Sequence, residues 1–230
     1  MPKKASKAAP IAAVLSLLAG TVWCADLPLG KIIDRVECQS DRAQTYALYI
    51  PANYSAERHW SVIFAFDPGA NGRRAVERYQ AAAEKYGYIV AASNNSRNGP
   101  WDVSLGAAKA MTGDVEQRFA VDPKRVYTAG MSGGARVAMR LALDAGPGQV
   151  MIAGVLASSA GFPGEFRRSV AFPIFGTAGS DDTIARGQLD SWMLYPRALL
   201  PHLLLGRMNA TAWGDALFGF QTMFAMSLGL

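Results

Sequence analysis

A glycine-rich turn around Ser132 is the part of this sequence best suited to nucleophilic chemistry. Residues 126–139 read VYTAGMSGGARVAM, in which Gly130-Met131-Ser132-Gly133-Gly134 separates an apolar run from a helical one. A Gly-x-Ser-x-Gly pentapeptide between a strand and a helix makes a tight turn that lifts the serine hydroxyl above the edge of a sheet. We therefore predict that Ser132 is a nucleophile. The alternative is an ordinary strand–turn–helix with a serine that faces solvent.

The glycines of this turn have distinct expected roles. Side chains at Gly130 and Gly134 would collide across the turn. The amide of Gly133 begins the following helix, where its N–H and the helix dipole favour a developing negative charge. We expect Gly133 to be one donor of an oxyanion hole.

The segment around this turn resembles a known family. Residues 119–143, FAVDPKRVYTAGMSGGARVAMRLAL, are similar to secreted bacterial α/β-hydrolase esterases of the polyhydroxyalkanoate-depolymerase and feruloyl-esterase type, as are YALYIPANY at 46–54 and FPIFGTAGSDD at 172–182. The resemblance covers about residues 31–182 and is poor beyond them. It implies a mostly parallel central sheet flanked by helices, the α/β-hydrolase fold, with a C-terminal part that departs from the family. It also implies hydrolysis of a small or polymeric carboxylic ester through an acyl-Ser132 intermediate, without a cofactor.

Two loops of this family carry further catalytic groups. The second oxyanion donor comes from the loop after the first central parallel strand, here FDPGANG at 66–72. Because Pro68 has no N–H, the donor is expected to be Gly69 or Ala70. A plain Pro-Gly turn is the alternative.

The catalytic acid is expected at the end of a later apolar strand. The Gly-x-x-Asp spacing of the family points to Asp182, with Asp181 in reserve. A carboxylate there would orient an imidazole and stabilise its charged form. The alternative is an aspartate pair that caps a helix beginning near Thr183.

The base is harder to assign, because the sequence has only two histidines. His59 precedes the strand expected at 61–66, whereas catalytic groups in open α/β sheets gather at the carboxyl ends of the strands. His202 is the remaining candidate. It stands before the apolar run of PHLLLG, although the base of the family follows the last strand, and GRMNATAW in the corresponding place has no histidine. A catalytically inactive binding protein of the same fold is therefore the alternative function.

A polar stretch after another central strand is expected at the same edge of the sheet. Residues 93–101 read SNNSRNGPW, in which Asn94, Asn95, Arg97 and Trp101 are candidates to line a substrate pocket. A polar turn ended by Gly-Pro is the alternative. Metal catalysis is not expected, since the two histidines stand far apart and no carboxylates cluster.

Short β-rich runs alternate with longer amphipathic runs, as in a sheet covered by helices. We expect strands at 32–37, 44–50, 61–66, 88–92, 125–129, 151–158 and 170–175, and helices at 73–85, 103–119 and 134–143. The middle strands are apolar on both faces, which fits parallel strands buried beneath helices.

The two ends of the chain differ from this core of 25–182. Residues 1–24 have a cationic start and a short apolar stretch, typical of a secretory signal peptide, so a periplasmic or secreted location is expected. Much of the net charge of +5 comes from this leader, and we expect no nucleic-acid partner. Residues 183–230 lack Lys and Glu and are rich in apolar residues. Either they form an apolar part of the same domain or their sequence has been replaced. Residues 213–230 approach the length of a membrane span, but Asp215 and Gln221 interrupt this apolar stretch.

Overall fold

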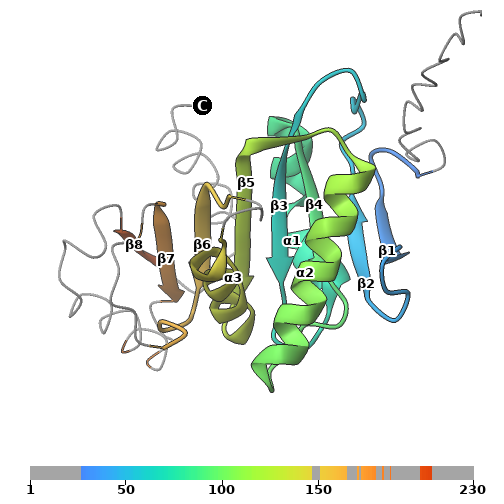
Figure 1. Cartoon of the computed structure of the whole chain (residues 1–230). Coiled ribbons are helices and arrows are strands. Elements are labelled where there is room, and N and C mark those ends of the chain that lie inside the picture. Colours follow the sequence, from blue (N-terminus) through green and yellow to red (C-terminus); the bar gives the residue numbers. More distant parts are fainter. Residues whose placement is uncertain are drawn as a thin grey trace, which may run out of the picture.

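The computed structural model describes residues 27–146, 151–164, 170, 172–179, 183, 187 and 203–208. They form one eight-stranded sheet in the order β1-β2-β4-β3-β5-β6-β7-β8 (Figure 1). The strands are β1 (Ile32–Glu37), β2 (Thr45–Tyr49), β3 (Trp60–Phe66), β4 (Tyr88–Ser93), β5 (Val121–Met131), β6 (Gly154–Ser158), β7 (Ile174–Gly179) and β8 (Leu203–Met208). The helices are α1 (Gly72–Tyr86), α2 (Trp101–Arg118) and α3 (Gly133–Asp144).

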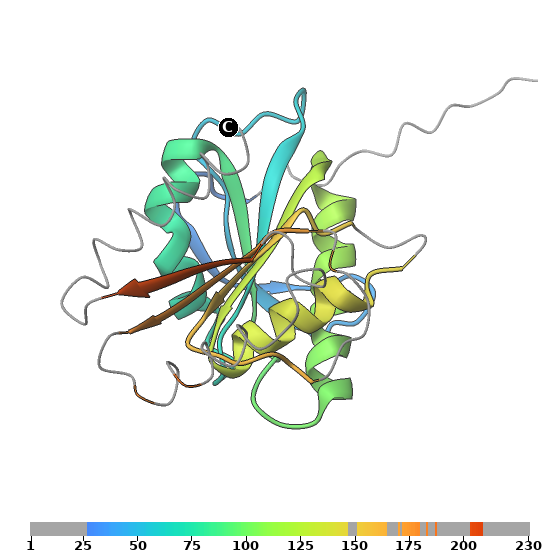
Figure 2. The same cartoon turned by 90° about the vertical axis from the view of Figure 1, so that its left-hand side faces the viewer.

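Helices cover both faces of the sheet. Figure 2 shows α1 on one side and α2 and α3 on the other. Ala75, Val76 and Tyr79 of α1 pack in one apolar cluster, whereas Met111 of α2 and Met139 of α3 belong to the cluster on the opposite face. The predicted α/β class is confirmed, and the apolar runs of β3 and β4 are buried at every position, as expected for central strands.

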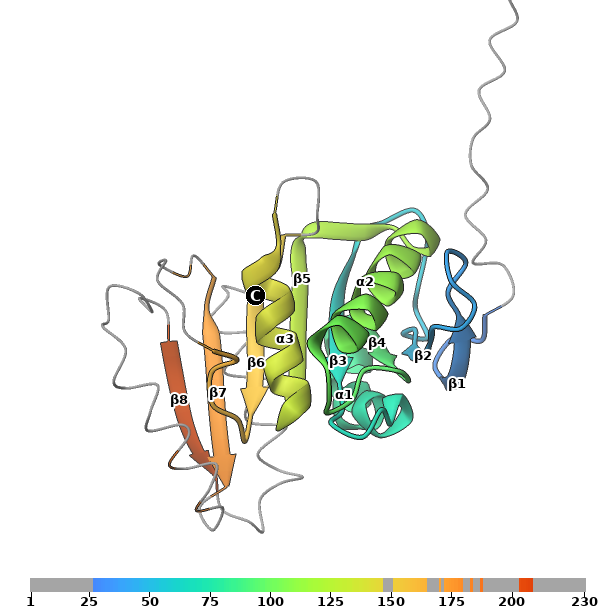
Figure 3. The ribbon, with the colours of Figure 1, turned by 60° about the horizontal axis from the view of Figure 1, so that its bottom comes forward.

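Strand direction determines where the site lies. β1 pairs antiparallel with β2, and β2 pairs antiparallel with β4, but every pair from β4 through β8 is parallel. In Figure 3 the arrowheads of β6, β7 and β8 point to the same edge. The loops after β3, β4 and β5 therefore leave the sheet at one carboxyl edge, the usual place for ligands in this class of sheet.

Most expected elements are found within a few residues of their predicted ends. The largest shift is in β7, which was predicted at 170–175 and lies at Ile174–Gly179. Small residues make up the second half of this strand, and all six of its residues are buried between β6 and β8. Pairing with neighbours on both sides thus overrides the low strand propensity of glycine and alanine. Within the C-terminal segment, the apolar run after His202 forms β8, which continues the same sheet.

Candidate active site

Ser132 lies in a strained turn between β5 and α3. Its backbone has φ 54° and ψ −123°, a conformation that L-residues rarely adopt. Its N–H donates to the carbonyl of Ser158 at the end of β6, at 2.8 Å, which ties the turn to the neighbouring strand. Ser132 occupies the N-cap position, but its hydroxyl does not cap the helix, and it has no hydrogen-bond partner among the described residues. The hydroxyl is thus held at the carboxyl edge, partly exposed and available to a ligand.

The steric role predicted for two glycines of the turn is confirmed. A Cβ atom on Gly130 would lie 2.6 Å from the backbone nitrogen of Ala135. One on Gly134 would collide with the carbonyl of Phe66 at the end of β3. The start of α3 therefore packs directly on the backbones of β3 and β5, and only glycine permits this approach.

The loop after β3 is braced by the carboxylate of Asp67. This side chain is 1% exposed and forms ion pairs with Arg74, at 3.2 Å, and Arg78, at 3.5 Å. Its Oδ1 also accepts from the N–H of Gly69, at 2.8 Å. The N–H of Ala70 donates to the backbone carbonyl of Asp67, at 3.3 Å. Both amides predicted as the second oxyanion donor are therefore engaged within their own loop.

Two asparagines of the loop after β4, Asn94 and Asn95, bond to different parts of the β1–β2 hairpin. The Asn94 amide donates to the carbonyl of Asp34, at 3.0 Å. The Asn95 amide bridges the backbones of Thr45 and Ala43, at 2.8 and 3.2 Å. Both predicted pocket residues thus hold the loop against the β1–β2 hairpin.

Two further candidates of this loop are more exposed. Arg97 is exposed, and its backbone N–H and carbonyl bond to the hydroxyl of Ser104. Trp101 begins α2 and is 42% exposed, which leaves its ring free to meet a substrate.

Asn98 lies in the same loop and is not among the residues predicted from the sequence. Its N–H donates to the carbonyl of Pro68, at 2.8 Å, so the loops after β3 and β4 are joined beside the turn. A Cβ atom on Gly133 would collide with the Asn98 side-chain amide. The amide therefore packs on the residue that follows Ser132. The polar loop SNNSRNGPW indicated this region, but only the path of the backbone shows that Asn98 is the asparagine that contacts Gly133.

The acid and the base predicted from the sequence, Asp182 and His202, lie outside the described residues. β7 ends at Gly179, at the carboxyl edge of the sheet, and the role of Asp182 stays a prediction. β8 begins at Leu203, which pairs with Ile174 at the start of β7, so this strand starts at the opposite edge from Ser132.

His59 lies at the amino-terminal edge of the sheet, as predicted. It is exposed and directly precedes β3. The seven residues of that strand separate it from the carboxyl edge by about 20 Å. His59 is therefore too distant to take a proton from Ser132.

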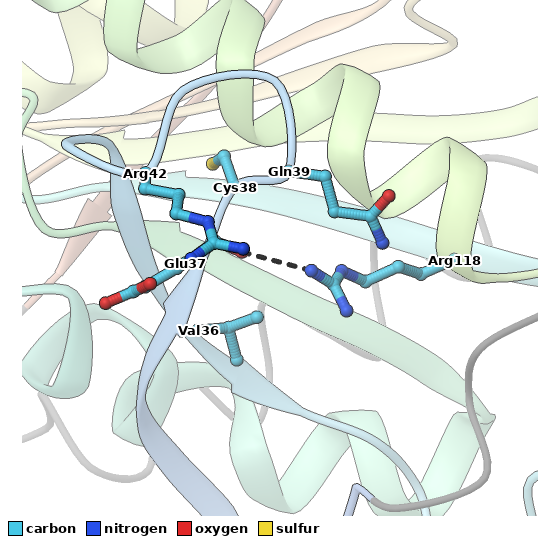
Figure 4. A pocket seen from close by; sticks show the side chains of 6 residues that line it. All are labelled: Val36, Glu37, Cys38, Gln39, Arg42 and Arg118. Carbon is cyan, nitrogen blue, oxygen red and sulfur yellow. Dashed lines mark hydrogen bonds between the residues drawn. The ribbon is translucent and has the colours of Figure 1, made fainter.

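The described residues also form a pocket away from these candidates. A pocket of about 670 Å³ is lined by residues from the end of β1, the turn after it and Arg118 of α2, and it includes none of the predicted site residues (Figure 4). Within the described ranges, no three His, Cys, Asp or Glu side chains are grouped to hold a metal ion. No described helix is long and apolar enough to cross a membrane.

Comparisons with known proteins identify the fold. No protein-family model matches the chain, and no curated protein matches it. Among solved structures, esterase 2 of Thermogutta terrifontis, phosphoramylated by tabun, has a TM-score of 0.62 at 13% identity over 86% of this chain and 94% of its own. The esterase LipW from Mycobacterium marinum has a TM-score of 0.64 at 15% identity, over 83% of this chain and 79% of its own. A hyperthermophilic esterase from the archaeon Pyrobaculum calidifontis has a TM-score of 0.61 at 12% identity, over 86% and 85%. The chain therefore has the α/β-hydrolase fold.

Proposed function

We propose that this chain hydrolyses carboxylic esters by acyl transfer to Ser132 and then to water. The observation that carries the proposal is the strained Ser132, which stands at the carboxyl edge beside the N-terminus of α3, with a hydroxyl that does not cap this helix. Backbone strain of this kind costs on the order of 1–3 kcal/mol and is found where function requires it. The structural neighbours described as esterases support the same reaction class.

The proposed reaction has two halves. Ser132 Oγ bonds to the ester carbonyl carbon and gives its proton to a base, while the carbonyl π electrons move onto the oxygen beside the Gly133 N–H. The oxyanion collapses, the bond to the alkoxy oxygen breaks, and the leaving alcohol takes the proton from the base. Water then attacks the acyl-enzyme in the same way, which releases the acid and restores Ser132.

The proposal assigns the remaining roles to residues outside the described ranges. Asp182 orients the imidazole, and His202 serves as the base. The substrate belongs to the ester class of the polyhydroxyalkanoate-depolymerase and feruloyl-esterase type, and Trp101 offers an aromatic surface to it.

A fluorophosphonate probe tests the nucleophile directly. The probe phosphonylates an activated serine, and one structural neighbour is described as phosphoramylated by tabun, a reaction of the same chemical kind. We expect labelling of the wild type at Ser132 and none of Ser132→Ala. An unlabelled wild type, or equal labelling of the variant, would overturn the proposal.

The second candidate is a catalytically silent binding protein with this fold, and the direction of β8 is the reason to test it. The strand that follows His202 starts at the edge opposite Ser132, and the sequence has no histidine after it. Turnover of p-nitrophenyl acetate separates the two candidates. Loss of turnover in both Ser132→Ala and His202→Ala supports the hydrolase, whereas a wild type without turnover supports the binding protein.

We also propose that the chain is exported, on the basis of the cationic and apolar sequence of residues 1–24. Fusion of these residues to alkaline phosphatase, which is active only after export, should give phosphatase activity in a bacterial host. The same fusion with Lys3, Lys4 and Lys7 replaced by Glu should give much less. Equal activity of the two fusions would contradict a signal peptide.

A further inference from the structure

The side chain of Asn98 lies against Gly133, the residue that follows Ser132. An ideal Cβ atom on Gly133 would overlap Asn98 Oδ1, the nearest atom, and would lie 2.8 Å from Cγ and 3.4 Å from Nδ2, so the amide rests against Gly133 with its oxygen foremost. In the proposed reaction, the N–H of Gly133 is the first oxyanion donor. The Asn98 amide lies beside the residue that carries this donor.

The Asn98 amide is also available for a ligand. Among the described residues its side chain has no hydrogen-bond partner, and the residue is exposed. Its backbone is held, because the N–H bonds to Pro68 and the adjacent Arg97 forms a β-bridge with Gly69. The backbone of Asn98 is thus held, while its side-chain amide has no partner among the described residues and can turn toward a ligand.

The backbone donors expected for this role are engaged elsewhere. The Gly69 N–H donates to the buried carboxylate of Asp67, which two arginines hold in place. The Ala70 N–H donates to the Asp67 carbonyl. Moving either amide to an oxyanion would break a hydrogen bond of this braced loop, whereas the Asn98 side chain gives up no bond to the part of the chain that the structure describes.

We propose that Asn98 is a catalytic residue whose side-chain amide supplies the second oxyanion donor. Rotation about its Cβ–Cγ bond turns Nδ2 toward the oxygen above Gly133, and the donor strengthens its bond as the carbonyl becomes an alkoxide. Asparagine side chains serve this role in other hydrolases, where loss of one donor reduces kcat by about 10²–10³-fold. The inference rests on the proposed acyl transfer to Ser132.

Substitution of Asn98 tests the inference through kcat and KM for p-nitrophenyl acetate. In Asn98→Ala we expect kcat to fall by about 10²-fold or more while KM changes little, because the donor acts mainly in the transition state. In Asn98→Asp we expect a larger fall, since a carboxylate repels the oxyanion. Asn53→Ala, at an exposed turn outside the site, is the matched control and should keep the wild-type kcat. The melting temperature should stay at the wild-type value in all three.

A second measurement separates this inference from the proposed function. Phenylboronic acid forms a tetrahedral adduct with an activated serine, and its B–O⁻ group then occupies the oxyanion position. We expect the side-chain amide resonances of Asn98 in ¹⁵N-labelled protein to shift on addition of the acid. If the fluorophosphonate probe labels the wild type but Asn98→Ala keeps its kcat and the Asn98 amide does not shift, the role of Asn98 is refuted alone. If the probe does not label the wild type, the proposed function fails, and an unshifted amide refutes Asn98 as well.

Discussion

At the scale of single residues, the turn at 130–134 brings the backbone of α3 into direct contact with the backbones of β3 and β5. The strained serine keeps its conformation because the strands and helix around it leave no room to relax, and the glycines make that packing possible. The loss in the free energy of unfolding on substitution of these glycines by alanine therefore measures how closely the turn is packed.

Gly134→Ala should destabilise the protein, because the added methyl group would collide with the carbonyl of Phe66, where the start of α3 packs on the end of β3. We expect a loss of about 1–3 kcal/mol in the free energy of unfolding, measured by urea denaturation. Gly106→Ala is the matched control, since Gly106 lies on α2 with open space around it, and it should gain up to about 1 kcal/mol from helix propensity. Equal stability of the two variants would show that α3 does not pack closely on β3.

The residues of the site were predictable to different degrees. Ser132 and its glycines follow from a local pattern, because a strand, a tight turn and a helix are all encoded within about a dozen residues. Asn98 was missed, because its contact with Gly133 joins loops that leave different strands. A polar loop offers several asparagines, and only the path of its backbone shows that Asn95 faces β2 while Asn98 faces α3.

At the scale of elements, the buried carboxylate of Asp114 anchors α2 to the β1–β2 hairpin. It accepts from the hydroxyl of Tyr46, at 2.7 Å, from Arg118 Nε, at 2.6 Å, and from the N–H of Gln39, at 2.8 Å. Burial, followed by the hydrogen bond and charge of Asp114, raises the pKa of Tyr46 far above its usual value. Nothing in the local sequence indicates this cluster, because its members come from three separate elements.

Asp114→Asn should destabilise the protein by about 3 kcal/mol, since it removes the negative charge that compensates a largely buried arginine. Tyr46→Phe removes one hydrogen bond from the same carboxylate and should cost only about 1 kcal/mol. Urea denaturation of both variants gives the comparison. A smaller loss in Asp114→Asn than in Tyr46→Phe would mean that the ion pair with Arg118 contributes nothing to stability.

The strands show why the fold was easier to predict than the ends of its elements. Apolar runs such as β3 and β4 are long and continuous, so their type is clear from the sequence. The position of β7 is not clear from the sequence, because the glycine and alanine of its second half have low strand propensity. Pairing with β6 and β8 holds these residues in the strand.

At the scale of the whole molecule, ionisable side chains of the core titrate far above neutral pH. Burial is the largest cause in each case, and it raises the pKa of Cys38 to about 11 and those of Tyr79 and Tyr127 to about 12. In the unfolded chain these groups have pKa values of about 8.5 for Cys and about 10 for Tyr. Below those pH values both states hold the proton, and the stabilisation by the neutral groups is fully present. This stabilisation is lost as the pH rises through the folded values, so the free energy of unfolding should fall steadily above about pH 9.

The thiol of Cys38 offers a simple readout of this buried state. Its side chain is fully buried, and burial together with the charge of Asp114 keeps its pKa near 11, so little thiolate forms at pH 8. In a Cys24→Ser variant, which leaves Cys38 as the single thiol, Ellman's reagent at pH 8 should react slowly with the folded protein and at once in 6 M guanidinium chloride. The reaction should accelerate in Asp114→Asn, because that variant unfolds more often and exposes the thiol. Rapid reaction of the folded protein at pH 8 would contradict the packing of α2 against the hairpin that encloses Cys38.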